Sequence, residues 1–231
     1  MKKIAIIKCG DTREAIKKEL GDFEDWIMQA TNLPTNLFSV YNLPKGDVLR
    51  HPDEFIGGIV TGSDAMVTDN TKWMKQLKDW LVTARYSNLP VLGICFGHQI
   101  MAEALGGKVE TNTAGESIGA VEVEFTNTAK TDPLFKGLGD SLETFAVHCQ
   151  HVTTLPVGAE VLARGKKAPI LAFKVGKMYG VQFHPEFNGG IMKMYTEDPS
   201  IDNPQKIKTK IRFEYRNQKV ISNFIDICAK F

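Results

Sequence analysis

The run Pro90-Val-Leu-Gly-Ile-Cys-Phe-Gly-His-Gln-Ile100 is the most informative part of this sequence. It starts as a short apolar segment, passes through the pattern G-x-C-x-G and continues with helical spacing. A buried strand that turns sharply into a helix has this form. Gly93 and Gly97 lack a Cβ, so strand and helix can approach closely and leave the Cys95 sulfur at the apex of the turn. The pattern predicts a nucleophile elbow with cysteine as the reactive residue.

The helix expected after this turn runs from Gly97 to Leu105 and stops at Gly106-Gly107. Its N-terminus offers unpaired N–H groups and a positive potential, which favour a thiolate over a thiol at Cys95. The same N–H groups can stabilise a developing oxyanion, and that of Phe96 is the nearest candidate.

Short apolar runs alternate with helix-period segments in the first half of the chain. The predicted strands there are Lys3–Lys8, Leu37–Tyr41, Gly58–Thr61 and Pro90–Cys95. The clearest amphipathic helix spans Thr71 to Tyr86. Strands then dominate: Ile118–Phe125, Leu142–Val147, Glu160–Ala163, Ile170–Val175 and Met178–Phe183. This order predicts an α/β fold with an open, mostly parallel central sheet flanked by helices, and with additional antiparallel strands in the second half.

Length and composition favour one globular domain. The 231 residues are 43% hydrophobic, enough for a large core, and we expect a single domain over residues 1–231. Its end should be a helix at about residues 217–231, preceded by a polar loop at 196–209. With 28 basic and 27 acidic residues the net charge is +1, so neither nucleic acid nor a membrane is an expected partner. No apolar run is long enough to span a bilayer.

The four cysteines, Cys9, Cys95, Cys149 and Cys228, lie far apart and form no CxxC pair. This spacing does not indicate a disulfide framework, and we expect a reducing, cytoplasmic location.

A second group of reactive residues lies in Tyr179-Gly-Val-Gln-Phe-His-Pro-Glu-Phe187. A strand delivers His184 and Glu186 at its C-terminal end, and side chains two apart on an extended segment point the same way. A cysteine nucleophile needs a base, and the base needs a third group to fix its tautomer. Cys95, His184 and Glu186 together supply these three parts.

A Gly-containing turn, Gly62-Ser63, ends the predicted strand Gly58–Thr61. Loops at the carboxyl ends of parallel strands gather around one crevice, where backbone N–H groups can face a ligand. A plain tight turn would leave the same trace, so this signal is weak by itself.

GICFGHQ and YGVQFHPEF together resemble the two signature motifs of the class I (triad-type) glutamine amidotransferases, and the chain resembles stand-alone members related to the amidotransferase domain of GMP synthase. The similarity covers about residues 40 to 190. It implies a flavodoxin-like fold and hydrolysis of glutamine through a γ-glutamyl thioester. Implied catalytic residues are the nucleophile Cys95, the base His184 and the orienting Glu186. The resemblance also implies an oxyanion hole of backbone N–H groups from Gly62, Ser63 and Phe96.

For the glutamine pocket, the resemblance implies contacts from Gln99, His148 and Gln150. Two departures from the family pattern stand out. The oxyanion turn is Gly62-Ser63 where the family often has Gly-Gly, and a backbone donor survives that change. The segment His148-Cys-Gln-His-Val152 places Gln150 where relatives of GMP synthase tend to have an aspartate. Gln150 cannot offer the same charge to the α-amino group of a substrate.

No metal or cofactor is expected. The ligands crowded into His148–His151 do not match structural-zinc spacings, and the chain has no Gly-rich phosphate loop of the Walker type. The leading hypothesis is cysteine-dependent hydrolysis of glutamine, with a separate synthetase subunit as the acceptor of the ammonia. One alternative is a γ-glutamyl peptidase acting on small peptides or conjugates. Another is a non-catalytic binding or regulatory module of the same fold.

Overall fold

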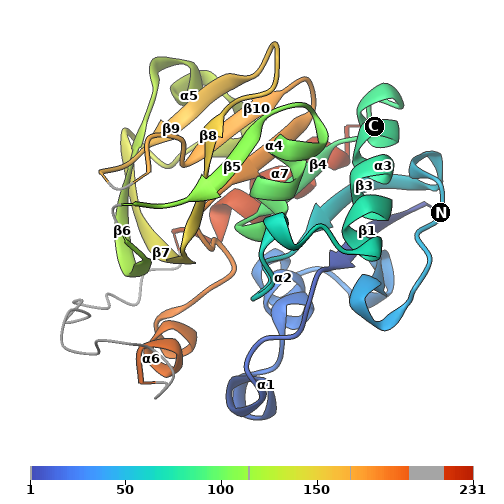
Figure 1. Ribbon diagram of the computed structural model, residues 1–231, viewed down its shortest axis with the longest axis horizontal. Helices are drawn as coiled ribbons and strands as arrows, with labels where there is room; N and C mark the ends of the chain where they lie inside the picture. The colour runs from blue at the N-terminus through green and yellow to red at the C-terminus, as the bar shows by residue number, and fades with distance from the viewer. Residues whose placement is uncertain (1, 114, 167, 198–215, 231) are drawn as a thin grey trace.

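A central sheet of nine strands organises the computed structural model (Figure 1), which describes residues 2–113, 115–166, 168–197 and 216–230. The strand order is β2-β1-β3-β4-β11-β10-β9-β6-β7. The bounds are β1 (Lys3–Lys8), β2 (Phe38–Asn42), β3 (Phe55–Val60), β4 (Val91–Ile94), β6 (Ser117–Phe125), β7 (Ser141–His148), β9 (Glu160–Arg164), β10 (Ala172–Val175) and β11 (Met178–Val181).

Five neighbouring strands, β2-β1-β3-β4-β11, pair in parallel. Numbered along the chain, they have the 2-1-3-4-5 order of the flavodoxin-like folds. Side chains of β1 alternate between two cores, with Ile4 and Ile6 on one face and Ala5 and Ile7 on the other. Burial on both faces explains the near-continuous apolar sequence. The predicted mostly parallel sheet is confirmed.

The rest of the sheet is antiparallel, as predicted for the second half of the chain. Gly176 and Lys177 form the two-residue turn between β10 and β11, and Gly176 has a positive φ of 60°. Two further strands, β5 (Lys108–Thr111) and β8 (Gln150–Thr154), were not predicted. They pair with each other in a separate small sheet.

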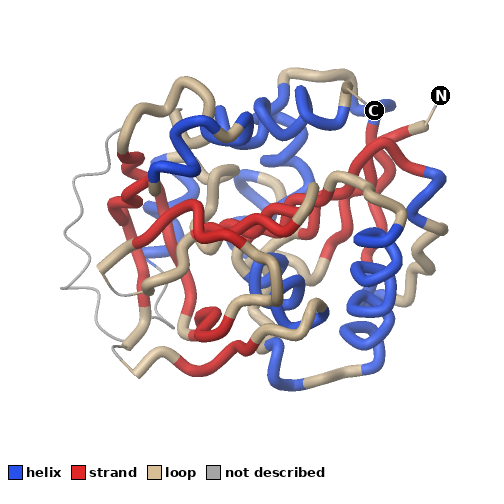
Figure 2. Tube along the Cα trace, turned by 90° about the horizontal axis from the view of Figure 1, so that it is seen from above, coloured by secondary structure: helices blue, strands red, loops and turns tan. Residues whose placement is uncertain are grey.

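Helices cover both faces of the parallel strands (Figure 2). On one face lie α3 (Lys72–Tyr86) and α4 (Phe96–Ala104), which share a core cluster with Ala5 and Ile7. On the other lie α2 (Phe23–Thr31) and α7 (Lys219–Cys228), which pack with Ile4 and Ile6. The helix predicted at 71–86 and the C-terminal helix predicted at about 217–231 are thus present, the second one shorter.

Three further helices are α1 (Glu14–Leu20), α5 (Asn127–Thr131) and α6 (Gly189–Glu197), and none of them, nor α2, was predicted. The loop predicted at 196–209 is corrected at its start, because residues 196 and 197 belong to α6; its remainder lies outside the described residues. Within the described part of the chain, no helix is long and apolar enough to cross a membrane.

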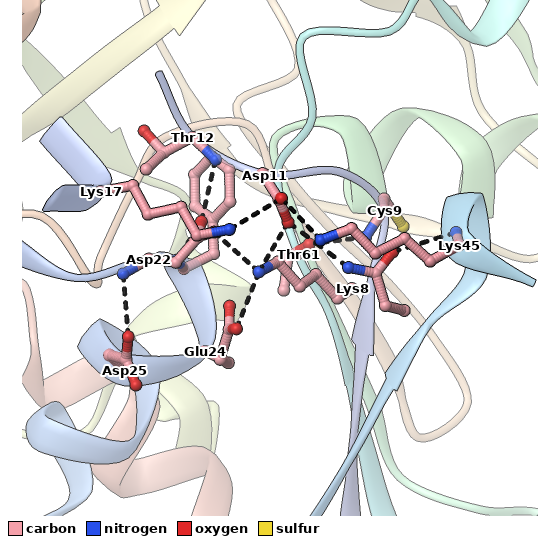
Figure 3. Close-up of polar contacts among 12 residues, drawn as sticks. Lys8, Cys9, Asp11, Thr12, Lys17, Asp22, Glu24, Asp25, Lys45 and Thr61 are labelled. Atoms are coloured by element: carbon pink, nitrogen blue, oxygen red, sulfur yellow. Dashed lines mark hydrogen bonds and ion pairs between the residues drawn. The ribbon is translucent and has the colours of Figure 1, made fainter. Parts of the chain in front are cut away.

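A buried ion-pair network fixes α2 to the end of β1 (Figure 3). The Lys8 ammonium group, 3% exposed, donates to Asp22 and Glu24 at 2.7 Å and pairs with Asp11 at 2.8 Å. Burial lowers the pKa of Lys8, but these carboxylates outweigh it and raise the pKa above its ordinary value. The other Asp22 oxygen accepts from the N–H of Phe23 at 2.8 Å and caps α2. The network therefore sets where Phe23 lies.

Candidate active site

Cys95 lies between β4 and α4, at the sharp turn that the sequence predicts. Its φ of 50° and ψ of −100° are unusual for a residue with a Cβ and strain the backbone. The Cys95 N–H donates to the Val181 carbonyl at 2.8 Å, and the Cys95 carbonyl accepts from the Gln99 N–H at 3.1 Å. Hydrogen bonds on both sides hold the turn in this conformation.

The two glycines of the turn are required by close backbone contacts. A Cβ at Gly93 would overlap the Gly97 carbonyl, and a Cβ at Gly97 would overlap the Val60 carbonyl in β3. These contacts let α4 begin directly behind the strand end, as the G-x-C-x-G pattern predicts.

The Cys95 sulfur faces a cavity of about 260 Å³ at the carboxyl ends of the parallel strands. Its Sγ lies 3.5 Å from the Val147 carbonyl of β7, and the Gln182 amide donates to it at 3.7 Å. The lining residues are Arg13, Ser63, Asp64, Ala65, Met66, Cys95, Gln99, Glu116, Ile118, Val147, His148, Cys149 and Gln150.

His184 and Glu186 follow β11, which ends at Val181, two residues before the predicted strand end. The His184 N–H donates to the Phe145 carbonyl of β7 at 2.8 Å, so the histidine backbone is attached to the antiparallel half of the sheet. His184 Nδ1 lies 2.8 Å from Glu186 Oε1, and both side chains are almost fully buried.

The charge state of His184 reflects these neighbours. Burial by itself would lower the pKa of His184, but the negative charges of Glu186 and Cys95, and hydrogen bonds to both, raise it to about 10. The imidazole is near enough to Cys95 to feel its charge, and its Nδ1 is hydrogen-bonded to the Glu186 carboxylate. The structure brings together the three residues that the sequence groups as Cys95, His184 and Glu186.

A cluster of aromatic rings packs against His184. Phe187 stacks on the imidazole with a centroid distance of 4.1 Å, and Phe23 is roughly parallel to it at 6.4 Å. Trp26 packs edge-on against both phenyl rings. Phe187 thus covers one face of the imidazole, and Phe23 and Trp26 continue the aromatic cluster beside this stack.

The three predicted oxyanion donors lie around the elbow. Phe96 is the first residue of α4, directly after Cys95. Gly62 lies against the His184 ring, since a Cβ there would be 3.0 Å from its Cε1. The Ser63 hydroxyl donates to the Cys9 carbonyl at 2.8 Å, which fixes the turn. Among the hydrogen bonds between described residues, none uses the backbone N–H of Gly62, Ser63 or Phe96.

The three predicted substrate contacts all line the cavity, but each also has a structural bond. The Gln99 amide donates to the Gln150 carbonyl at 2.8 Å and to Gln182 Oε1 at 3.2 Å. His148 Nδ1 lies 3.0 Å from the same Gln150 carbonyl. The Gln150 amide donates to the Thr68 hydroxyl at 3.0 Å. These bonds fix the wall of the cavity beside Cys95.

Three charged residues of the cavity were missed by the sequence analysis: Arg13, Asp64 and Glu116. Arg13 belongs to the loop after β1, and Asp64 directly follows the Gly62-Ser63 turn. The rule that loops at the carboxyl ends of parallel strands form the site could have found both. Glu116 precedes β6, and only the tertiary fold brings it to the cavity.

The site thus places a cysteine at a strand-to-helix elbow, beside a buried histidine–carboxylate pair on a flavodoxin-like sheet. The model of the family described as "Glutamine amidotransferase class-I" matches residues 63–199, more than half of the chain. The chain belongs to this family.

Among curated proteins, the chain is similar to the glutamine-hydrolyzing GMP synthase subunit of Methanosphaera stadtmanae, with 47% identity over 102 residues. The same-named protein of Pyrococcus abyssi is 44% identical over 101 residues. Each match covers 43% of this chain and 52% of the relative, so the matched segment spans about half the length of these proteins.

Solved structures extend the likeness to the whole fold. A glutamine amidotransferase from Thermotoga maritima superposes with a TM-score of 0.79 over all of both chains, at 22% identity. One from Methylobacillus flagellatus gives 0.77 over 98% of this chain and 95% of that one, at 20% identity. At this identity the likeness establishes the fold.

Proposed function

We propose that this chain hydrolyses glutamine to glutamate and ammonia through a γ-glutamyl thioester on Cys95. The observation that carries the proposal is the placement of Cys95 at the apex of a strained elbow, against a histidine whose Nδ1 is held by Glu186 at 2.8 Å. Because Glu186 occupies Nδ1, Nε2 is the nitrogen available to the sulfur. Residues 1–231 act as one glutaminase domain in this proposal.

The reaction starts from a thiolate at Cys95 and an imidazolium at His184. The sulfur attacks the γ-carbonyl carbon, and the carbonyl π electrons move to the oxygen. As this tetrahedral intermediate collapses, the C–N bond breaks and His184 gives its Nε2 proton to the departing ammonia. The neutral imidazole then takes a proton from water. Hydroxide attacks the thioester, and glutamate leaves as the thiolate and imidazolium are restored.

Backbone groups stabilise the oxyanion in this scheme. The donors are the N–H of Phe96, the first residue of α4, where the helix dipole adds positive potential, and the N–H groups of the Gly62-Ser63 turn. Gln99, His148 and Gln150 form the adjoining wall, where the rest of the substrate binds.

Substitution of Cys95 tests the nucleophile. Cys95→Ala should reduce glutamate release by about 10⁴-fold or more while leaving the fold intact, because removal of a triad member leaves only binding and oxyanion stabilisation. Cys149→Ala is the matched control, since that thiol lines the same cavity. Equal activity of the Cys95→Ala variant and the wild type would refute the assignment.

A thiol-directed diazo-ketone analogue of glutamine separates an enzyme from a non-catalytic module of the same fold. Stoichiometric labelling at Cys95, located by mass spectrometry, supports the enzyme. Unlabelled protein that also releases no glutamate supports the module.

A γ-glutamyl peptidase is the second candidate, because the cavity reaches the partly exposed Met66, where a leaving amine larger than ammonia can be accommodated. The thioester chemistry is the same. Glutamine and a set of γ-glutamyl dipeptides should be compared by kcat/KM. Preference for the dipeptides would move the assignment to the peptidase.

The partner proposed is a separate ammonia-accepting synthetase subunit. Support comes from the similarity of the matched segment to proteins named as subunits of a glutamine-hydrolyzing GMP synthase. Glutamate release should rise when the partner fraction of a cytoplasmic lysate is added to the pure chain. Full activity of the isolated chain, unchanged by any fraction, would favour hydrolysis as the end purpose.

A further inference from the structure

The segment from His184 to Phe187 carries the proposed base and its orienting carboxylate, yet few of its own backbone groups hold it in place. Its first N–H bonds to the Phe145 carbonyl, and Pro185 has no N–H to donate. The Phe187 N–H reaches the His184 carbonyl at only 3.4 Å. The carbonyls of Pro185 and Phe187, on either side of Glu186, need a donor from elsewhere.

Asn217 supplies that donor. Its Nδ2 donates to the Phe187 carbonyl at 2.7 Å and to the Pro185 carbonyl at 3.1 Å, and the residue is 1% exposed. Only the nitrogen end of an amide carries two hydrogens, so the orientation of this side chain is fixed by its two partners.

Asn217 is anchored to the N-terminus of α7. The Asn217 carbonyl accepts the N–H of Val220, in the first turn of that helix, at 3.1 Å. Val220, Ile221 and Phe224 are fully buried in the core beneath the sheet. Because α7 is anchored in the core, the hydrogen bonds of the Asn217 amide fix the segment that contains Glu186 relative to that core.

Glu186 depends on this backbone support more than its burial suggests. One carboxylate oxygen is paired with His184, but Oε2 has no hydrogen-bond partner among the described residues. Side-chain bonds alone leave the carboxylate free to pivot about His184. The carbonyls bound by Asn217 belong to the residues immediately before and after Glu186. The amide therefore fixes the backbone of Glu186, from which the carboxylate extends.

The Phe187 ring depends on the same amide. It stacks on the imidazole at 4.1 Å, and its carbonyl is the nearer of the two Asn217 acceptors. One side chain thereby holds both the carboxylate at the edge of the imidazole and the ring on its face.

We infer that Asn217 is a positioning residue of the active site, which keeps Glu186 and Phe187 in register with His184 although it touches none of the reacting atoms. The inference rests on the proposed function and adds a residue outside the segment 63–199 that matches the family model. Loss of the amide should loosen the Glu186–His184 pair, so that burial lowers the basicity of His184.

Asn223 offers a closely matched control on α7. Its Nδ2 also donates to two backbone carbonyls, those of Leu134 at 2.9 Å and Lys136 at 3.0 Å, and it is 8% exposed. Both amides thus reach from the C-terminal segment of the chain to two carbonyls of an earlier segment. Only Asn217 binds carbonyls of the segment that carries His184 and Glu186.

The experiment compares wild type, Asn217→Ala, Asn217→Ser and Asn223→Ala as full chains. Glutamate release is measured from pH 5.5 to 10, and the rate of Cys95 alkylation by iodoacetamide is followed by mass spectrometry over the same range. Denaturation midpoints show which Asn217 variant loses about as much stability as Asn223→Ala, and the kinetic comparison is made between those two variants. Asn217→Ser retains a hydroxyl donor and serves if the alanine variant does not fold.

For Asn217→Ala we expect a fall in kcat of about tenfold to a hundredfold with KM within about twofold, since a misplaced base loses rate more than binding. The limb of both pH profiles that reports His184 should move to lower pH by about one unit. Asn217→Ser should lie between, and Asn223→Ala should keep kcat within about twofold and the limb in place.

Profiles of the Asn217 variants that coincide with that of Asn223→Ala would overturn the inference and leave the glutaminase proposal intact. A wild type that releases no glutamate would remove the proposed function instead. The alkylation profile would still decide whether Asn217 tunes the Cys95–His184 pair.

Discussion

The two sides of the candidate active site are built in different ways. Cys95 lies in one contiguous stretch that holds a buried strand, two glycines and a helix start, and the more distant backbone groups that touch the turn, those of Val60 and Val181, belong to neighbouring parallel strands. His184 is placed by groups from several distant elements, namely Phe145 of β7, the Phe23 ring of α2 and Asn217 before α7, in addition to the nearby Phe187 ring. A local motif can position a nucleophile, whereas a buried base needs a tertiary environment to hold its tautomer and charge.

The largest effect on glutamate release, among variants that probe this contrast, is expected for Glu186→Gln. The amide is nearly isosteric but cannot favour the imidazolium, and activity should fall by about 10³-fold. Steady-state kinetics measure the loss. A fall of less than about tenfold would mean that the surrounding rings, rather than the carboxylate, fix His184.

The same variant tests the stability linkage. The pKa of His184 is raised to about 10 from an ordinary 6.5, so its contribution to folding is complete below about pH 6.5 and is lost as pH rises through about 10. Within that window each pH unit removes at most about 1.4 kcal/mol. Denaturation curves at pH 6.5, 8 and 9.5 should show a smaller decline for Glu186→Gln than for wild type. Parallel declines would contradict the pairing.

Gly97→Ala tests the cysteine side. The new Cβ would overlap the Val60 carbonyl, so α4 must shift, and a displacement near 1 Å should cost about a hundredfold in activity. Stability should fall by about 3 kcal/mol from overpacking. Gly190→Ala in α6 is the control, because the nearest atom there is the end of the Asn188 side chain at 3.2 Å. Normal activity of Gly97→Ala would show that the elbow tolerates rearrangement.

Phe187→Leu should reduce kcat by about tenfold, because the imidazole loses the face of its closest ring. Phe125→Leu is the control, since Phe125 packs against Phe135 in a tilted arrangement with a centroid distance of 4.6 Å in the main core. Both variants should lose about 1–2 kcal/mol of stability. If kcat falls equally in the two, the effect reflects stability and the ring does not position His184.

The smallest effect on activity is expected for Lys8→Met. Removing the ammonium group leaves the buried Asp22 carboxylate with only the longer ion pair to Lys17 at 3.3 Å, which should cost about 3 kcal/mol of stability. Activity in the folded protein should change by about threefold at most, because Phe23 is the more distant ring. Lys45→Met removes an exposed partner of Asp11 and should cost less than about 1 kcal/mol. Chemical denaturation of both variants measures the difference.

Much of the parallel half was predictable because its signals are local. The strand predicted at Lys3–Lys8 agrees with β1, and the helix predicted at Thr71–Tyr86 differs from α3 by one residue. The predicted start of β3 is three residues late, since Gly57 interrupts the apolar run; in the fold this glycine packs against Cys228.

Elements that depend on a partner were missed. β5 is largely exposed and has no apolar alternation, so only its pairing with β8 makes it a strand. α6 begins at Gly189-Gly190, a sequence more typical of a turn than of a helix.

The same division applies to the site. The grouping of Cys95, His184 and Glu186 followed from two motifs, each readable alone. Asn217 lies 31 residues beyond Glu186 by number, and its sequence context carries no functional signal. Its contacts exist only because α7 packs beside the sheet, which sequence spacing does not encode.

The backbone of Cys95 has a consequence for how stability and chemistry compete at one position. A φ of 50° with a ψ of −100° costs a residue with a Cβ about 1–3 kcal/mol, a penalty that glycine largely escapes. The residue with the lowest backbone strain at the elbow would thus be glycine, which has no reactive atom. Cysteine is a compromise there, and its one advantage over glycine is the sulfur it presents to the cavity.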